Sequence, residues 1–114
     1  MRSNKGVHDT YCRDVTDRLW EHRDDKFGPR LREVVLFREY GGKKPGEIDV
    51  YAIKYSKNKT YCLKFEIKSS DHYRRKATNQ LQRSNRLFKG MDIKNFYVHY
   101  DEELDKLVYE YIKN

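Results

Sequence analysis

Apolar side chains recur with helical spacing near the N-terminus of the chain, while acidic and basic residues fill the positions between them. The apolar positions are Val7, Tyr11, Cys12, Val15, Leu19 and Trp20. A repeat of this period predicts an amphipathic helix from about Val7 to Arg23. Phe27-Gly28-Pro29 follows and is expected to end it.

Three segments rich in β-branched and aromatic residues come next and predict strands. They span 32–40, 47–55 and 60–68. Between the last two, Ser56-Lys57-Asn58-Lys59 has the composition of a turn, so these strands are expected to form a hairpin. The third strand alternates. Its two faces are Tyr61, Leu63, Phe65 and Ile67 on one side, and Cys62, Lys64, Glu66 and Lys68 on the other.

The remaining chain predicts a second helix and a fourth strand. Ser69-Ser70-Asp71 offers N-cap residues for a helix reaching about Lys89. Its apolar stripe consists of Tyr73, Ala77, Leu81, Ser84, Leu87 and Phe88. A strand is expected over 93–100. Residues 101–113 fit either a helix, through Leu104, Leu107, Val108 and Tyr111, or a strand over 107–112; we favour the helix. The order α-β-β-β-α-β indicates an α/β (α+β) fold, a mixed sheet flanked by helices.

The composition narrows the class of protein. With 114 residues, the chain is expected to form a single domain over residues 1–114. Its 25 Lys and Arg against 18 Asp and Glu give a net charge of +7, which favours nucleic-acid binding, although a merely cationic protein has the same balance. The two cysteines and four histidines lack zinc-ligand spacing. The absence of a long apolar run or signal-like start predicts an intracellular, cytoplasmic protein with no membrane partner.

Three residues on the predicted hairpin carry the candidate chemistry. Glu66 and Lys68 leave the same face of their strand, and Asp49 is an isolated acid on the strand before it. If the hairpin closes, Asp49 and Glu66 project from neighbouring positions. Two close carboxylates repel unless a cation lies between them, and oxygen ligands of this kind hold Mg²⁺ or Mn²⁺. Without such pairing, Glu66 and Lys68 would form an ordinary solvated ion pair.

The segment Pro45-Gly-Glu-Ile-Asp49, followed after sixteen residues by Glu66-Ile67-Lys68, resembles the motif of the PD-(D/E)xK nuclease superfamily. The resemblance covers about residues 7–100 and implies a restriction-endonuclease-like core. It also implies that Asp49, Glu66 and the carbonyl of Ile67 bind the metal ion, and that Lys68 is the catalytic lysine. The sequence departs from the pattern at Pro45, which lies four residues before Asp49 instead of next to it.

The same resemblance points to supporting residues. Family members often carry an extra metal ligand in the first helix, where His8 and Asp9 are the candidates here; a partly buried histidine and a solvated acid are the alternatives. Some branches carry a catalytic glutamine after the lysine. Helical geometry turns Gln80 toward the sheet and Gln82 away from it, and Gln80 could equally have a structural role. Cations expected to contact phosphates are Arg74, Arg75, Lys76 and Arg83 on the second helix, and Lys43 and Lys44 before the Asp49 strand.

These patterns predict a Mg²⁺- or Mn²⁺-dependent endonuclease that hydrolyses DNA phosphodiester bonds. The small basic domain is similar to Holliday junction resolvases, which implies a structure-directed or weakly sequence-selective enzyme acting as a homodimer. The alternative is a non-catalytic nucleic-acid-binding module with the nuclease fold. A third reading is a basic interaction protein unrelated to nucleic acid. The choice of DNA over RNA stays open.

Overall fold

The computed structural model describes residues 4–22, 30–36, 48–55 and 57–113. Its helices and strands are α1 (Asn4–Glu21), β1 (Arg30–Leu36), β2 (Val50–Tyr55), β3 (Thr60–Lys68), α2 (Arg74–Ser84), β4 (Asp92–Asp101) and β5 (Lys106–Ile112). Single 3₁₀ turns, Asp71–Tyr73 and Asn85–Phe88, flank α2. The predicted order of the first six elements is therefore confirmed, and the fold is mixed α/β.

The strands form one five-stranded sheet in the order β1-β2-β3-β4-β5. β1, β2 and β3 are antiparallel neighbours, β4 runs parallel to β3, and β5 returns antiparallel to β4. The helix α2 makes the crossover that a parallel β3–β4 pair requires. The predicted pairing of the second and third strands is confirmed, with Val50 opposite Phe65 and Tyr55 opposite Thr60.

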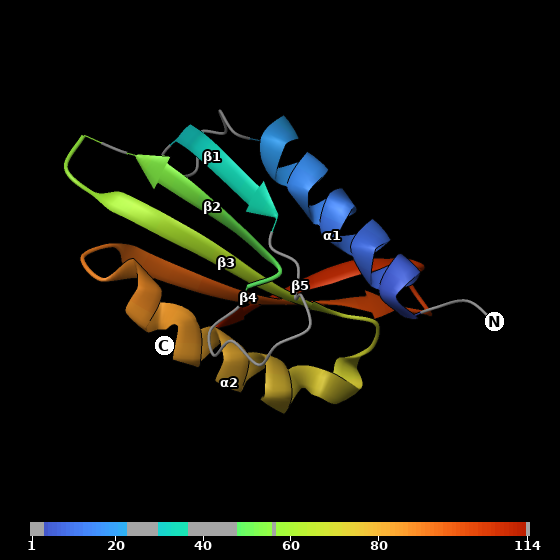
Figure 1. Ribbon diagram of the computed structural model, residues 1–114. Coiled ribbons are helices and arrows are strands. Elements are labelled where there is room, and N and C mark those ends of the chain that lie inside the picture. The colour runs from blue at the N-terminus through green and yellow to red at the C-terminus, as the bar shows by residue number, and fades with distance from the viewer. Residues whose placement is uncertain (1–3, 23–29, 37–47, 56, 114) are drawn as a thin grey trace.

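One helix covers each face of the sheet (Figure 1). Cys12 and Val15 of α1 pack with Val50, Phe65, Ile67 and Val98 on one face. Ala77 and Leu81 of α2 pack with Tyr97 and Ile112 on the other. Successive strand residues point to opposite faces, so the odd-numbered residues of β3 meet α1 and the even-numbered ones face α2. The side chains of Lys64, Glu66 and Lys68 thus share the α2 side.

The C-terminal segment is a strand, and our preference for a helix there was wrong. β5 pairs with β4 along its whole length, from Asp101 opposite Lys106 to Asn95 opposite Ile112. A tight turn makes this possible: the backbone N–H of Leu104 donates to Asp101 Oδ1 at 3.1 Å, and Asp105 adopts a φ of 50°. Pairing with β5 satisfies the backbone groups of β4 on that side, which outweighs the weak helical period of four apolar residues.

The second helix is shorter and less buried than its apolar stripe predicts. Within it only Ala77, Leu81 and Ser84 are buried, whereas Tyr73 and Leu87 at its two flanks are exposed. The buried amine of Lys64 compensates for this narrow apolar contact. Its Nζ donates to Leu81 O at 2.5 Å, Ser84 Oγ at 2.6 Å and Asn85 Oδ1 at 2.7 Å. A cation therefore holds the C-terminal end of α2 against β3, where the helix dipole is negative.

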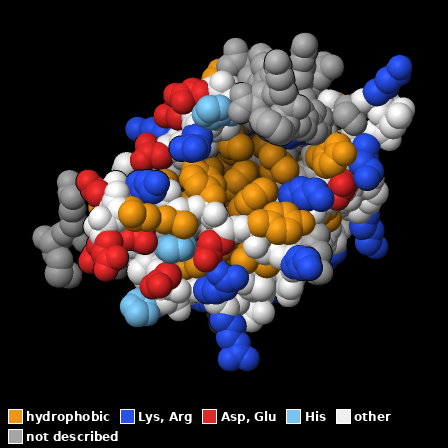
Figure 2. Space-filling view, turned by 180° about the vertical axis from the view of Figure 1, so that it is seen from behind, with side chains coloured by type: hydrophobic (Ala, Val, Ile, Leu, Met, Phe, Trp, Pro, Cys, Tyr) orange, Lys and Arg blue, Asp and Glu red, His pale blue; other side chains and the backbone are white. Residues whose placement is uncertain are grey.

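Aromatic rings continue the α1-facing side of the sheet across β4 and β5. Phe96 stacks on Phe65 with ring centroids 5.0 Å apart, and Tyr111 meets Phe96 edge-on at 5.6 Å. Tyr111 remains 50% exposed. Figure 2 shows hydrophobic side chains gathered in the middle of one face of the molecule, with Lys and Arg side chains around them. Among the described residues, neither helix combines the length and the apolar character needed to span a bilayer.

Candidate metal centre

The open end of the β2–β3 hairpin brings two acids together. Val50 lies opposite Phe65, so the register carried one residue further sets Asp49 opposite Glu66. Asp49 precedes β2 rather than belonging to it, and its Oδ2 accepts a hydrogen bond of 2.9 Å from the backbone N–H of Ile67. This bond replaces a ladder hydrogen bond at the end of the strand pair and fixes the carboxylate beside Glu66.

Glu66 is buried, with 4% of its surface exposed. Burial raises the pKa of its carboxyl well above the usual range, and the hydrogen bond and negative charge of Asp49 raise it further. Lys68 opposes the rise in pKa, because its Nζ lies 3.5 Å from Glu66 Oε1. A divalent cation stabilises such an arrangement, in which a buried carboxyl group lies beside a second acid.

His8 of α1 completes this end of the sheet. Its Nε2 lies 3.0 Å from Ile67 O and 3.2 Å from Asp49 Oδ2. A carbonyl oxygen can only accept, so Nε2 carries the hydrogen in this arrangement. The hydrogen bond that the imidazole donates to the Asp49 carboxylate is the main cause that raises the pKa of His8, and partial burial opposes it. The imidazole therefore bridges α1 to the carboxyl end of β3.

The structure brings together five of the residues that sequence reasoning selected: His8, Asp49, Glu66, Ile67 through its carbonyl, and Lys68. The carboxylates of Asp49 and Glu66 and the carbonyl of Ile67 are hard oxygen donors, the kind of ligand that Mg²⁺ takes in proteins.

The two candidate ligands of the first helix, His8 and Asp9, differ in their position relative to Asp49. Asp9, the next residue along α1, is not part of the group of His8, Cys12 and Asp49 whose possible metal-binding atoms gather among the described residues. Cys12, one helical turn after His8, was not selected as a candidate ligand from the sequence. Its Sγ lies 3.8 Å from His8 Nε2. The four-residue spacing of His8 and Cys12 was the signal that could have found it.

Gln80 lies on α2 and is half-buried, while Gln82 is exposed, as helical geometry predicted. The Oε1 of Gln80 is buried and has no hydrogen-bond partner among the residues that the structure describes. Its side chain thus points inward, and its Oε1 accepts no hydrogen bond from Lys68 or any other described residue.

The cations of α2 remain at the surface. Arg74, Arg75, Lys76 and Arg83 are all exposed. Arg74 is engaged in an ion pair with Glu110 of β5. An ion pair of this kind competes with a phosphate for the cation. Phosphate contact is therefore expected mainly from the other three cations, Arg75, Lys76 and Arg83. Lys43 and Lys44 lie outside the described residues.

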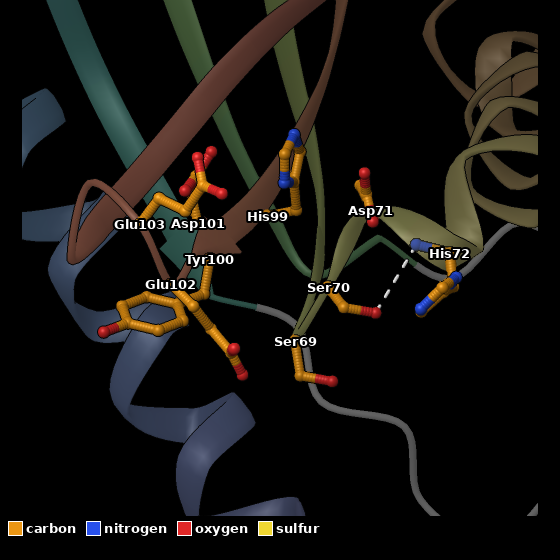
Figure 3. Close-up of a pocket in the computed structure, with 9 residues that line it drawn as sticks. All are labelled: Ser69, Ser70, Asp71, His72, His99, Tyr100, Asp101, Glu102 and Glu103. Carbon is orange, nitrogen blue, oxygen red and sulfur yellow. Dashed lines mark hydrogen bonds between the residues drawn. The ribbon is translucent and has the colours of Figure 1, made fainter.

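An acidic pocket of about 420 Å³ adjoins the candidate centre where the parallel strands β3 and β4 end. Its lining comprises Ser69, Ser70, Asp71, His72, His99, Tyr100, Asp101, Glu102 and Glu103. Figure 3 shows Asp101 and Glu103 on one side, Asp71 and His72 on the other, and His99 between them. The sequence did not predict this pocket, because three of its four acids, Asp101, Glu102 and Glu103, come from the end of β4 and the turn after it, where we had expected a helix. Carboxylates here repel a phosphate, so a polyanion is expected to approach from elsewhere or with a bound cation.

No family model matches this chain, and no match is found among curated proteins or among solved structures. The class that the fold defines is therefore a mixed α/β domain with a five-stranded sheet.

Proposed function

We propose that this chain is a Mg²⁺- or Mn²⁺-dependent endonuclease that hydrolyses DNA phosphodiester bonds, with a restriction-endonuclease-like core. The observation that carries the proposal is the meeting of Asp49, Glu66, Lys68 and the Ile67 carbonyl at one end of the β2–β3 hairpin. An ion pair on a solvated face would not place a second acid against a buried glutamate.

Asp49 and Glu66, with the Ile67 carbonyl, would hold the metal ion. When bound, such an ion polarises the phosphodiester, lowers the pKa of a water molecule and stabilises the leaving oxygen. Lys68 is held 3.5 Å from Glu66 and contributes a fixed positive charge where the phosphate gathers negative charge. The side chain of Lys68 is 19% exposed, so it is in contact with solvent although the neighbouring Glu66 is nearly buried.

The exposed cations of α2 support substrate binding. Arg75 and Lys76 lie in the first turn of α2, the helix that connects β3 to β4, and they would contact phosphates without reading base sequence. This favours a structure-directed or weakly sequence-selective enzyme, such as one acting on branched DNA. A homodimer would present two such centres to two strands.

The test is cleavage of supercoiled plasmid and of a branched DNA junction with Mg²⁺, with Mn²⁺ and with EDTA. We expect metal-dependent cleavage that falls at least about 100-fold in Asp49→Asn, Glu66→Gln and Lys68→Met. Matched controls are Asp92→Asn and Lys94→Met, an acid and a lysine near the opposite end of β4 whose side chains lie 3.7 Å apart. These controls should cleave like the wild type.

The same experiment separates the alternative function. Salt-dependent DNA binding without cleavage under any metal condition would show a non-catalytic nucleic-acid-binding module. Equal loss of cleavage in the Asp92→Asn control would show that the effect is not specific to this centre.

A further inference from the structure

His8, Cys12 and Asp49 bring three different metal-binding atoms to one point. A nitrogen, a sulfur and a carboxylate oxygen all lie within 4.8 Å of one another. His8 and Cys12 share one face of α1, one turn apart. Asp49, the residue just before β2, lies next to them. The Ile67 carbonyl, 3.0 Å from His8 Nε2, adds an oxygen from β3.

We propose that these residues form a site for a thiophilic divalent cation of the Zn²⁺ class, distinct in chemistry from the Mg²⁺ site but sharing Asp49 with it. Zinc takes imidazole nitrogen, thiolate sulfur and carboxylate oxygen in tetrahedral geometry, and three protein ligands with one open position form a common zinc arrangement. Mg²⁺ prefers oxygen ligands, so the nitrogen and sulfur select the softer ion.

The separations suit a tetrahedral ion. Bond lengths of about 2.3 Å to sulfur and about 2.0 Å to nitrogen or oxygen place tetrahedral ligands about 3.3 to 3.5 Å apart. Cys12 Sγ lies 3.8 Å from His8 Nε2, and Asp49 Oδ2 lies 3.2 Å from that nitrogen. Shifts of a few tenths of an ångström would bring His8 Nε2 to this spacing from both partners. The third separation, between Cys12 Sγ and an Asp49 oxygen, lies within 4.8 Å, and rotation of the two side chains can shorten it.

Binding replaces protons and changes no oxidation state. The thiol of Cys12 loses its proton to solvent as the Zn–S bond forms. In neutral His8 the hydrogen moves from Nε2 to Nδ1 through solvent, which frees the Nε2 lone pair for zinc and breaks the hydrogen bond to Ile67 O. The side chains of His8 and Asp49 are 35% and 18% exposed, so an ion can reach the buried sulfur past them.

The shared carboxylate has a consequence that rests on the proposed function. An ion held by His8, Cys12 and Asp49 withdraws Asp49 from the Mg²⁺ site, so Zn²⁺ is expected to inhibit Mg²⁺-dependent cleavage. Cys12→Ser should relieve this inhibition by about tenfold or more, because a hydroxyl is a poor substitute for a thiolate as a zinc ligand.

The test uses the full chain without DNA. Co²⁺ serves as a coloured stand-in for Zn²⁺, and its near-ultraviolet thiolate charge-transfer band reports a metal–sulfur bond. We expect a band that saturates at one Co²⁺ per chain, disappears on addition of Zn²⁺, is absent in Cys12→Ser and persists in Cys62→Ser. Cys62 is the matched control, since it is also a buried cysteine but lies on the face toward α2.

His8→Ala, at a partly exposed position, is a second variant in case Cys12→Ser does not fold, and it should weaken Co²⁺ binding at least tenfold. Circular dichroism checks the fold of every variant. A wild type that gives no thiolate band, or a band that survives in folded Cys12→Ser, would overturn the proposal. Because the readout is spectroscopic, a folded chain that binds Co²⁺ through Cys12 but never cleaves DNA would retain this site and refute only the nuclease.

Discussion

Replacing Lys64 with methionine tests how a buried amine holds α2 on the sheet. The side chain is fully buried, and its Nζ meets Leu81 O, Ser84 Oγ and Asn85 Oδ1. Two of these acceptors keep another donor in the variant, because Ser84 Oγ donates to Leu81 O at 2.9 Å and Asn95 Nδ2 to Asn85 Oδ1 at 3.1 Å. Only Ser84 Oγ loses the donor that the structure shows for it.

One buried acceptor left without a donor costs about 1 to 3 kcal/mol. Methionine fills a similar volume, so we expect Lys64→Met to lower the free energy of unfolding by about 2 kcal/mol at pH 7. For a chain of this size, that loss corresponds to a fall in Tm of roughly 8 °C. Urea unfolding followed by circular dichroism measures it, with Lys94→Met as the control and an expected change within about 0.5 kcal/mol.

The difference between the two proteins should also depend on pH. Burial lowers the pKa of Lys64 from 10.5 to about 8 in the folded chain. Between these values the unfolded chain holds a proton that the folded chain has released, so the free energy of unfolding of the wild type rises with pH. The methionine variant lacks this contribution, and the gap between them should widen by roughly 1 kcal/mol from pH 7 to pH 9.

A variant as stable as the wild type, or more stable, would refute the reasoning. It would mean that burying the ammonium costs as much as its three hydrogen bonds contribute, as happens where hydrophobic groups replace buried ion pairs.

Three further predictions concern the candidate centre and the surface. In EDTA, Glu66→Gln should raise the free energy of unfolding by about 1 kcal/mol at pH 8. This gain in stability over the wild type should shrink toward pH 5. The pKa of Glu66 is higher in the folded chain than in the unfolded chain, so the wild type is most stable below the unfolded pKa and loses stability as pH rises through the folded pKa. An equal gain at both pH values would contradict this. Tyr97→Phe removes the hydrogen bond to Ser70 O and should cost about 1 kcal/mol in the same urea assay, and an unchanged midpoint would show that the bond contributes nothing. The double variant Arg75→Ala with Lys76→Ala should reduce the slope of log K against log salt for duplex DNA by about 2, and an unchanged slope would exclude these cations from the interface.

Local pattern was sufficient for most elements of the fold. Alternation fixed the limits of β3, and the turn composition around Lys57 and Asn58 predicted its pairing with β2, because these signals depend on neighbouring residues alone. The meeting of Asp49 with Glu66 followed from that pairing, since hairpin register determines which residues lie opposite each other. The helical spacing of α1 likewise turned His8 toward the sheet.

Tertiary structure decided the rest. The last segment carries apolar residues that suit a helix or a strand, and only the open edge of β4 selected the strand β5. Lys64 looked like one more polar residue on an alternating strand, yet the end of α2 lies over it and buries it. Cys12 was readable as core, and it became a potential ligand only when the fold brought Asp49 to His8. The sequence by itself determined periods and short-range pairings because these require only local geometry. The pairing of β5 with the edge of β4, the burial of Lys64 under the end of α2, and the approach of Asp49 to Cys12 depended on contacts between distant parts of the chain.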